Sequence, residues 1–295
     1  MEDLSLFYDF WKEKKEKIDE FIEKSLPSSE DFPSVLLQAM RYGILNGGKR
    51  IRPVITLAIS HVFGGKDEKV LPAACAIEFV HSSSLILDDL PCMDNALMRR
   101  GKETCHRVFG EDIAILAAFG LLNHAFYLIT TLREKKVKEK TITNLISILT
   151  DAIGPNGLIA GQTVDLTTKK PVDFELLEFM HSKKTGALFQ ASAIFGAILS
   201  NANEHELEAV KNYAKNLGLA FQIKDDILDT KGDPKKMGKE RGKDKRETNF
   251  VSFAGLEGAK KIMEELVETS IKSISFIPKN ELLVQLAKYV MLRES

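Results

Sequence analysis

Two groups of aspartates stand at the ends of apolar segments in this chain. The groups are Asp88, Asp89 and Asp94 in the first, and Asp225, Asp226 and Asp229 in the second. Adjacent carboxylates repel each other unless a cation lies between them, and Mg²⁺ prefers oxygen ligands of this kind. One such pair is more often a solvated helix end. Two groups, each after an apolar helix, predict two helices that face each other across a cavity and hold several Mg²⁺ ions.

Basic residues follow a glycine pair early in the chain. Lys49, Arg50 and Arg52 come directly after Gly47 and Gly48, just before the next apolar segment. Cations on a glycine-rich loop at the start of a helix are typical of a diphosphate-binding site. Without the aspartate groups, a solvated basic turn would be an equally good interpretation.

These motifs together resemble those of the trans-type prenyl diphosphate synthases, over nearly the whole chain. The family's first motif, DDxxxxD followed by two arginines, matches Asp88 to Asp94 with Arg99 and Arg100, and its second, DDxxD, matches Asp225 to Asp229. Further landmarks stand in the family's order, at residues 47–53, His81, 161–166, 184–187 and 221–222. Each landmark alone is weak, and their common order makes the resemblance specific.

The resemblance implies that the protein joins isopentenyl diphosphate to an allylic diphosphate, namely dimethylallyl, geranyl or farnesyl diphosphate. It implies Mg²⁺ bound by the six aspartates, which also count as catalytic together with Lys184, Thr185 and Gln222. The residues that it implies for substrate binding are Lys49, Arg52, His81, Arg99, Arg100, Lys184 and Lys239. His81 is also a candidate general base, but on a mostly apolar helix the binding role is the better interpretation.

Product length is predicted from the residues before the first motif. In this family the residues four and five before the first aspartate line the product tunnel, and they are Ser84 and Ser83 here. One to two turns earlier on the same face, Val80 and Ile77 are the expected stops for the growing chain. Small serines favour geranylgeranyl diphosphate as the product, and farnesyl diphosphate is the alternative.

Two other functions deserve comparison with this one. A non-catalytic partner subunit of a heteromeric synthase typically loses the aspartate groups, and both are intact here. A terpene cyclase needs no second diphosphate pocket, so Lys49, Arg52 and Arg100 would have no role in it.

Two departures from the family stand out: Ala118 and Phe119 replace a usual Gly-Asp, and Glu247 lies where a basic residue is usual.

The elements that must position these residues are helices, because no segment alternates with period two over a strand's length. We therefore predict an all-α, single-domain helical bundle of isoprenoid synthase type over residues 1–295. The expected helices are an amphipathic one ending by Pro27 and others near 33–46, 53–63, 68–90, 111–132, 139–153, 173–200, 204–230, 255–275 and 280–293. Within 173–200, Gly186 should weaken the helix and turn Lys184 and Thr185 inward.

One long segment, 231–250, has no regular pattern. It is basic and rich in glycine, which favours a lid that closes over a diphosphate.

Composition limits the remaining possibilities. A net charge of −1 over 295 residues argues against general nucleic-acid binding. Three cysteines without a metal-binding spacing favour reduced thiols, and no basic leader or apolar run of membrane-spanning length is evident. We expect a cytoplasmic protein without stable membrane insertion. The apolar run 113–132 and the family resemblance predict a homodimer.

Overall fold

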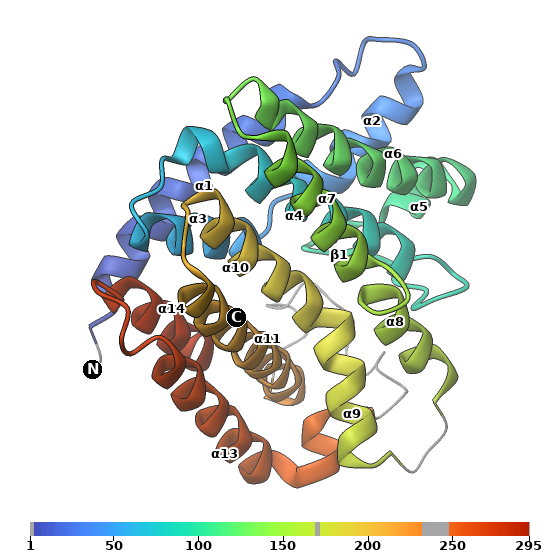
Figure 1. The fold of residues 1–295 in the computed structure, drawn as a ribbon. Coiled ribbons are helices and arrows are strands. Elements are labelled where there is room, and N and C mark those ends of the chain that lie inside the picture. The colour runs from blue at the N-terminus through green and yellow to red at the C-terminus, as the bar shows by residue number, and fades with distance from the viewer. Residues whose placement is uncertain (1–2, 169–171, 232–247, 295) are drawn as a thin grey trace.

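The structure, a computed structural model, describes residues 3–168, 172–231 and 248–294. Its helices pack into one bundle (Figure 1), and several of them line a pocket inside it. They are α1 Ser5–Ser25, α2 Ser34–Leu45, α3 Ile51–Val62, α4 Asp67–Asp88, α5 Cys105–Phe109, α6 Glu111–Thr130, α7 Glu139–Ile153, α8 Leu158–Thr167, α9 Phe174–His181, α10 Ala187–Leu199, α11 Glu204–Lys231, α13 Phe250–Ser273 and α14 Glu281–Leu292. Short turns η1 Thr131–Arg133 and η2 Ser182–Gly186 join neighbouring helices.

The predicted all-α class is confirmed. Within the described residues the sheet content is one small antiparallel hairpin, β1 Met98–Arg99 with β2 Lys102–Glu103. The sequence did not predict this hairpin or the helices α5 and α8. It also placed the start of α13 too late, at 255, where the glycine has a φ of 71° inside the helix. The side chain of Asn249 accepts a hydrogen bond from Ser252 N and begins α13 earlier.

The first aspartate motif begins at the last residue of one central helix and continues into the following turn, and the second lies within another central helix. α4 is apolar almost all round and packs against α3, α6 and α10, which buries it on several sides. α11 packs on the other side of α10 and against α13. α4 ends at Asp88, three residues before Pro91, so the first motif occupies the end of a buried helix.

The helix predicted over 173–200 is interrupted near Gly186, where the sequence predicted it to be weak. Asp173 caps α9 by accepting a hydrogen bond from Leu176 N. The helix then widens into a π-turn at η2, which contains Lys184 and Thr185, and continues as α10. Since π-turns shift the facing of side chains, this one accounts for the orientation of both residues.

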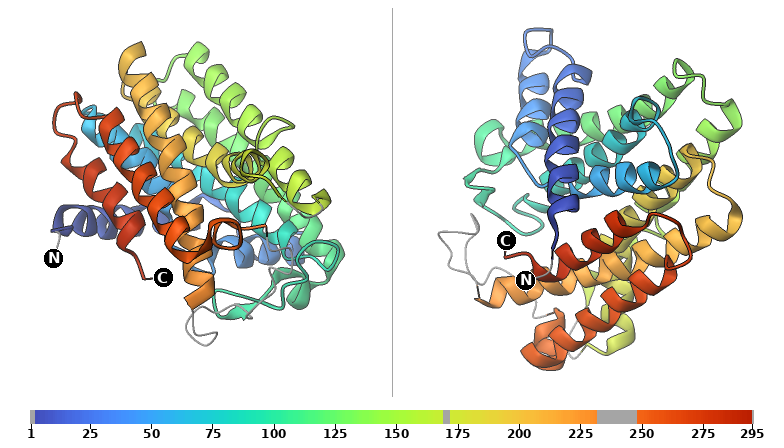
Figure 2. Two further views of the ribbon diagram at one scale, coloured as in Figure 1. Left: turned by 90° about the horizontal axis from the view of Figure 1, so that it is seen from below. Right: turned by 90° about the vertical axis from the view of Figure 1, so that its left-hand side faces the viewer.

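The two ends of the chain meet beside the bundle. α1 runs across the direction of α11, α13 and α14 (Figure 2, right). It packs on α14 through ring contacts, with Tyr289 lying 4.8 Å from Phe7 and 5.3 Å from Trp11 between centroids. Both terminal helices therefore belong to the same aromatic cluster.

Two helices are apolar over a longer stretch than was expected from the sequence. In the described part of the chain, Asp67–Asp88 and Glu111–Arg133 are long and apolar enough to cross a membrane by length and composition alone. The apolar window of the first is 72% buried, as in a core helix, whereas that of the second is 39% buried. The expectation that no segment reaches this length is wrong. α6 leaves Leu116, Phe119 and Tyr127 exposed.

Candidate active site

A pocket of about 630 Å³ lies between α4 and α11. α4 contributes residues spaced by three or four, which share one face of the helix, and α11 does the same from the opposite wall. The loop before α3 with the first turn of α3, and the π-turn, close the sides. The lining residues from these four parts are Glu78, His81, Ser84, Leu85, Asp88, Phe221, Gln222, Asp225, Asp229, Gly48, Lys49, Arg50, Arg52, Lys184 and Thr185.

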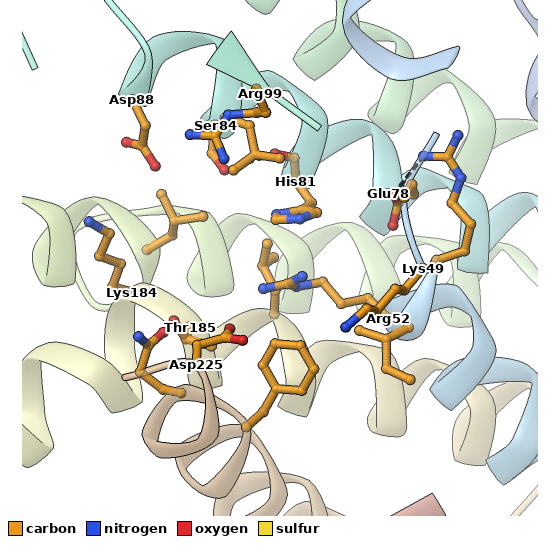
Figure 3. A pocket seen from close by; sticks show the side chains of 18 of the residues that line it. Lys49, Arg52, Glu78, His81, Ser84, Asp88, Arg99, Lys184, Thr185 and Asp225 are labelled. Atoms are coloured by element: carbon orange, nitrogen blue, oxygen red, sulfur yellow. Dashed lines mark hydrogen bonds and ion pairs between the residues drawn. The ribbon is translucent and has the colours of Figure 1, made fainter. Parts of the chain in front are cut away.

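Four of the six predicted metal ligands face this pocket. Figure 3 shows Asp88 on one wall and Asp225 with Lys184 on the other, while Lys49 and Arg52 lie to one side. Asp94 and Asp229 also line the pocket. The two walls therefore present carboxylate oxygens toward a common space.

The middle aspartate of each motif has a different position. Asp89 is 3% exposed and accepts two hydrogen bonds of 2.8 Å from Arg99 Nε and one of 2.6 Å from Arg99 Nη2. Asp226 accepts from Gln222 Nε2 at 3.0 Å and from Phe250 N at 2.9 Å. These contacts distinguish Asp89 and Asp226 from the four aspartates that line the pocket, and Mg²⁺ binding by all six stays a prediction. These two carboxylates hold neighbouring elements in place.

The carboxylates that face the pocket carry like charges, so a bound cation would stabilise their charged form. Burial, with a smaller contribution from Asp94, raises the pKa of Asp88 to about 6. Within the described ranges, no group of three or more acidic, histidine or cysteine side chains lies close enough together to hold a metal ion. The acids instead face each other in pairs across the pocket. The pocket-facing aspartates offer only oxygen ligands, and burial disfavours the charged form of Asp88 unless a cation lies nearby. Such a site fits Mg²⁺ bound between the two walls together with substrate phosphates.

Lys184 stands opposite Asp88 and is fixed by α8. Its Nζ donates to Asp165 Oδ2 at 2.7 Å. Burial opposes its charge, but Asp88 and Asp165 outweigh this and raise the pKa of Lys184. Gly161 allows the close approach, since a Cβ there would lie 2.1 Å from Lys184 N. The 161–166 landmark therefore positions Lys184.

The cationic side of the pocket has little negative charge to balance it. Burial, and then the charge of Arg293, lowers the pKa of Lys49 to about 8, and burial lowers that of Arg52 to about 10. Among the described residues, no hydrogen-bond partner reaches the buried Nε of Arg52. Burial and the nearby arginines hold the pKa of His81 well below its usual value, which keeps its imidazole neutral. Such a site is suited to an anionic ligand.

The two arginines after the first motif take different roles. Arg99 belongs to the acidic side through Asp89, whereas Arg100 packs on the glycine loop and donates to the carbonyl of Gly47. A Cβ on Gly48, which has a φ of 125°, would lie 2.8 Å from the Arg100 guanidinium. Glycine is needed there for both reasons.

A buried ion pair supports the cationic loop, and the sequence did not reveal it. Arg50 has a φ of 53° and donates to Glu78 at 2.8 Å, to Asp19 at 2.8 Å and to the carbonyl of Ile44 at 2.7 Å. The side chains of Arg50 and Glu78 are 1% and 2% exposed. An acid in the middle of the apolar stretch 73–80 was the available signal.

Thr185 and Gln222 form an ordered chain beside the acids. Thr185 Oγ1 donates to Gln222 Oε1 at 2.8 Å, and Gln222 Nε2 donates to Asp226. The inward position predicted for Thr185 is confirmed, and this chain fixes the direction of the Gln222 amide dipole.

The apolar part of the pocket involves one of the four predicted chain-length residues. Ser84 lines the pocket beside Leu85, Leu158 and Leu188. Ser83 instead donates to the carbonyl of Ala118 on α6 at 2.8 Å. Val80 and Ile77, 2% and 0% exposed, are buried and do not line the described pocket. Ser83 and Ser84 thus point to different sides of α4. The chain-length roles of Ser83, Val80 and Ile77 stay predictions, whereas Ser84 is placed at the described pocket.

Other lining residues were not predicted. Gln162 has both amide atoms buried, without a hydrogen-bond partner in the described part of the chain, and Arg293 reaches the pocket from the far end of the sequence. Lys239 and most of the expected lid, 231–250, including Glu247, lie outside the described residues.

Comparison with known proteins agrees with this geometry. Residues 33–274 match the family model described as Polyprenyl synthetase. Geranylgeranyl pyrophosphate synthase 3, chloroplastic, of Arabidopsis thaliana is 40% identical over 290 residues, covering 96% of this chain and 80% of the relative. A dimethylallyltranstransferase of Fischerella ambigua is also 40% identical over 290 residues, covering 97% and 83%.

Solved structures with the same fold carry related descriptions. An FPP/GFPP synthase from Zymomonas mobilis superposes with a TM-score of 0.87 at 34% identity, covering 98% of this chain and 100% of its own. A geranyltransferase from Helicobacter pylori, complexed with magnesium and isoprenyl diphosphate, gives 0.85 at 30% identity, covering 99% and 97%.

Proposed function

Because the chain belongs to the polyprenyl synthetase family, we propose that it is a Mg²⁺-dependent trans-prenyltransferase that makes geranylgeranyl diphosphate from isopentenyl diphosphate and allylic diphosphates. One observation carries the proposal. A single pocket has carboxylates on two facing walls and a separate group of buried cations beside them. Head-to-tail condensation needs both, because one diphosphate must leave while the other stays attached.

The acidic half suits the allylic diphosphate. Asp88, Asp94, Asp225 and Asp229 would hold Mg²⁺, which as a Lewis acid would neutralise the charge that develops on the leaving diphosphate. Lys184 adds a fixed positive charge on the opposite wall, which favours the same leaving group. Arg99 is held near this site by Asp89.

The region between the two halves suits the allylic cation. The oxygen dipoles of Thr185 and Gln222 are held in fixed directions by their hydrogen bonds. Leu158 and Leu188 give apolar walls, which exclude water that would trap the cation as an alcohol. The proton lost at the end passes to the released diphosphate, which lies beside the new bond.

The cationic half suits isopentenyl diphosphate. Lys49, Arg52 and Arg100 would bind its diphosphate, and neutral His81 would add a hydrogen bond. No metal ligand is needed in this half, so this substrate is held without being ionised.

The decisive experiment is a product assay with labelled isopentenyl diphosphate and each allylic primer. We expect the dephosphorylated product to be the twenty-carbon alcohol, since the relatives named above include geranylgeranyl synthases and Ser84 leaves space in the pocket. A fifteen-carbon product would favour the alternative, farnesyl diphosphate synthase. Full activity in excess chelator would refute the Mg²⁺ assignment.

We also propose a homodimer that forms through α6. Leu116, Phe119 and Tyr127 are 52%, 61% and 57% exposed and recur along one side of this helix. Phe119, which replaces a usual aspartate, adds apolar surface there. Light scattering at micromolar concentration should give a dimer, and Leu116→Asp should weaken it while the exposed control Phe276→Asp does not. A monomeric wild-type protein would contradict the proposal.

A cytoplasmic location remains a proposal as well. The free thiols of Cys75, Cys92 and Cys105 support a reducing compartment. Cell fractionation tests it directly, since recovery of the protein with membranes or inside an organelle would contradict it.

A further inference from the structure

Arg293 reaches the pocket from beyond the segment 33–274 that matches the family model. Its side chain is 3% exposed although it follows the last residue of α14. Nη2 donates to Asp225 Oδ1 at 2.6 Å and to the carbonyl of Phe221 at 3.0 Å, and the guanidinium lies 4.0 Å from the Phe221 ring centroid. Three contacts thus hold Arg293 on one turn of α11.

The carboxylate that Arg293 contacts is also needed by the metal. Asp225 lines the acidic half of the pocket, and 40% of its side chain is exposed toward that space. A divalent cation bound there would lie close to a guanidinium, and the two positive charges would repel each other. Arginine and metal therefore compete for Asp225.

Arg293 also acts on the cationic half. After burial, its charge is the next largest cause of the lowered pKa of Lys49, so Arg293 lies near Lys49 as well as in contact with Asp225. A diphosphate bound at Lys49 would attract Arg293, and the same diphosphate would relieve the repulsion between the two cations.

A continuous series of contacts joins Arg293 to the Lys49 loop. The backbone N of Arg293 donates to Tyr289, whose ring packs on Trp11, and Trp11 donates to the carbonyl of Lys49. Arg293 itself has extended backbone angles, φ −55° and ψ 145°, directly after the helix. Because Arg293 follows the last residue of α14, a different rotamer of its side chain would not require α14 to move.

We propose that Arg293 is a switch between the two halves of the site. In the state described here it neutralises Asp225. When Mg²⁺ and an allylic diphosphate occupy the acidic half, Arg293 turns to the diphosphate of the second substrate beside Lys49. This inference depends on the proposed function. It makes the two substrates bind cooperatively, because each favours the same position of Arg293.

The first test measures Mg²⁺ binding by calorimetry without substrate. Arg293→Gln should bind Mg²⁺ at least about 5-fold more tightly than wild type, the lower end of typical coupling between sites. Arg133→Gln, which removes an exposed arginine paired with Glu139, is the matched control and should bind as wild type does. Equal affinity in wild type and Arg293→Gln would overturn the switch.

The second test measures the affinity for isopentenyl diphosphate with and without Mg²⁺ plus a non-ionisable thio analogue of an allylic diphosphate. Wild type should gain about 5-fold or more from these additions, and Arg293→Gln should lose this gain. Arg293→Lys, which keeps the charge and tests for loss of folding, should retain part of it.

The outcomes separate the two proposals. Wild-type protein that binds neither Mg²⁺ nor isopentenyl diphosphate would contradict the proposed function and the switch together. Binding of both ligands without coupling, or coupling that persists in Arg293→Gln, would leave the proposed function standing and overturn the switch alone.

Discussion

The indole Nε1 of Trp11 donates a hydrogen bond of 2.8 Å to the carbonyl oxygen of Lys49. Trp11 lies on α1, outside the segment matched by the family model, and it is the only tryptophan in the sequence. The contact fixes the loop from which Lys49 enters the cationic half of the pocket. A residue near the N-terminus therefore positions a substrate-binding lysine.

We predict that isopentenyl diphosphate changes the fluorescence of Trp11. In Trp11→Phe the loss of one neutral hydrogen bond, about 0.5–1.5 kcal/mol, should raise the KM for isopentenyl diphosphate by about 2- to 10-fold and leave kcat nearly unchanged. Steady-state kinetics measures both. Tyr8→Phe, in the same aromatic cluster, is the control. A fall in kcat with an unchanged KM would contradict the positioning role.

Binding of isopentenyl diphosphate should weaken as the pH rises through the pKa of Lys49. Burial and Arg293 lower this pKa to about 8, so the lysine is charged below that pH and loses its proton above it. The ligand's negative charge favours the protonated form and raises the pKa in the complex. At pH 8, binding should take up about half a proton, which calorimetry in buffers of different ionisation enthalpy measures.

Lys49→Arg provides the control for this pH dependence. Arginine stays charged over the whole range, so its binding curve should be flat between pH 7 and 9. A wild-type affinity that is equally flat would show that Lys49 is not the group responsible.

Asp88 and Asp89 should fail in different ways when replaced. Asp88→Asn removes a carboxylate that faces the pocket, and kcat should fall by orders of magnitude while the fold is kept. Asp89→Asn leaves Arg99 without its buried partner, so the free energy of unfolding should fall by about 3 kcal/mol. Urea denaturation and kinetics on both variants distinguish the roles. Equal stability of the two variants would contradict the assignment of Asp89.

Ser84, rather than Ser83, should control product length. Ser84→Phe places a ring in the apolar part of the pocket and should shorten the product from twenty carbons to fifteen, as chromatography of the dephosphorylated alcohols would show. The rate of the first condensation should change little, because both diphosphate sites are untouched. Twenty-carbon product from Ser84→Phe would contradict this.

Two controls use residues of α4 that do not line the described pocket. Ser83→Ala should cost about 1 kcal/mol of stability by removing the hydrogen bond to Ala118. Val80→Ala should cost about 2 kcal/mol because it deletes two buried methyl groups. Neither should alter product length. Longer products from Val80→Ala would restore the role predicted from sequence.

The sequence by itself determined the fold class and the chemistry. Helical periodicity, the two aspartate groups and the glycine-rich basic loop are local patterns, and they predicted an all-α protein with a Mg²⁺ site and a diphosphate-binding loop. The order of the motifs gave the family resemblance, which implied a reaction between two diphosphates. The weak point at Gly186 was predicted for the same reason, since a glycine in a helix has a known local effect.

The tertiary structure decided which of those residues face the substrate. Adjacent residues on a helix point about 100° apart, so Asp88 and Ser84 face the pocket whereas Asp89 meets Arg99 and Ser83 meets α6. Neighbouring helices, not the motif, set this division. Arg293 and Trp11 reach the site through packing between segments far apart in the sequence, and such long-range contacts leave no local pattern to read. Glu78 left a local signal, an acid within an apolar stretch, but its partners Arg50 and Asp19 were decided by packing.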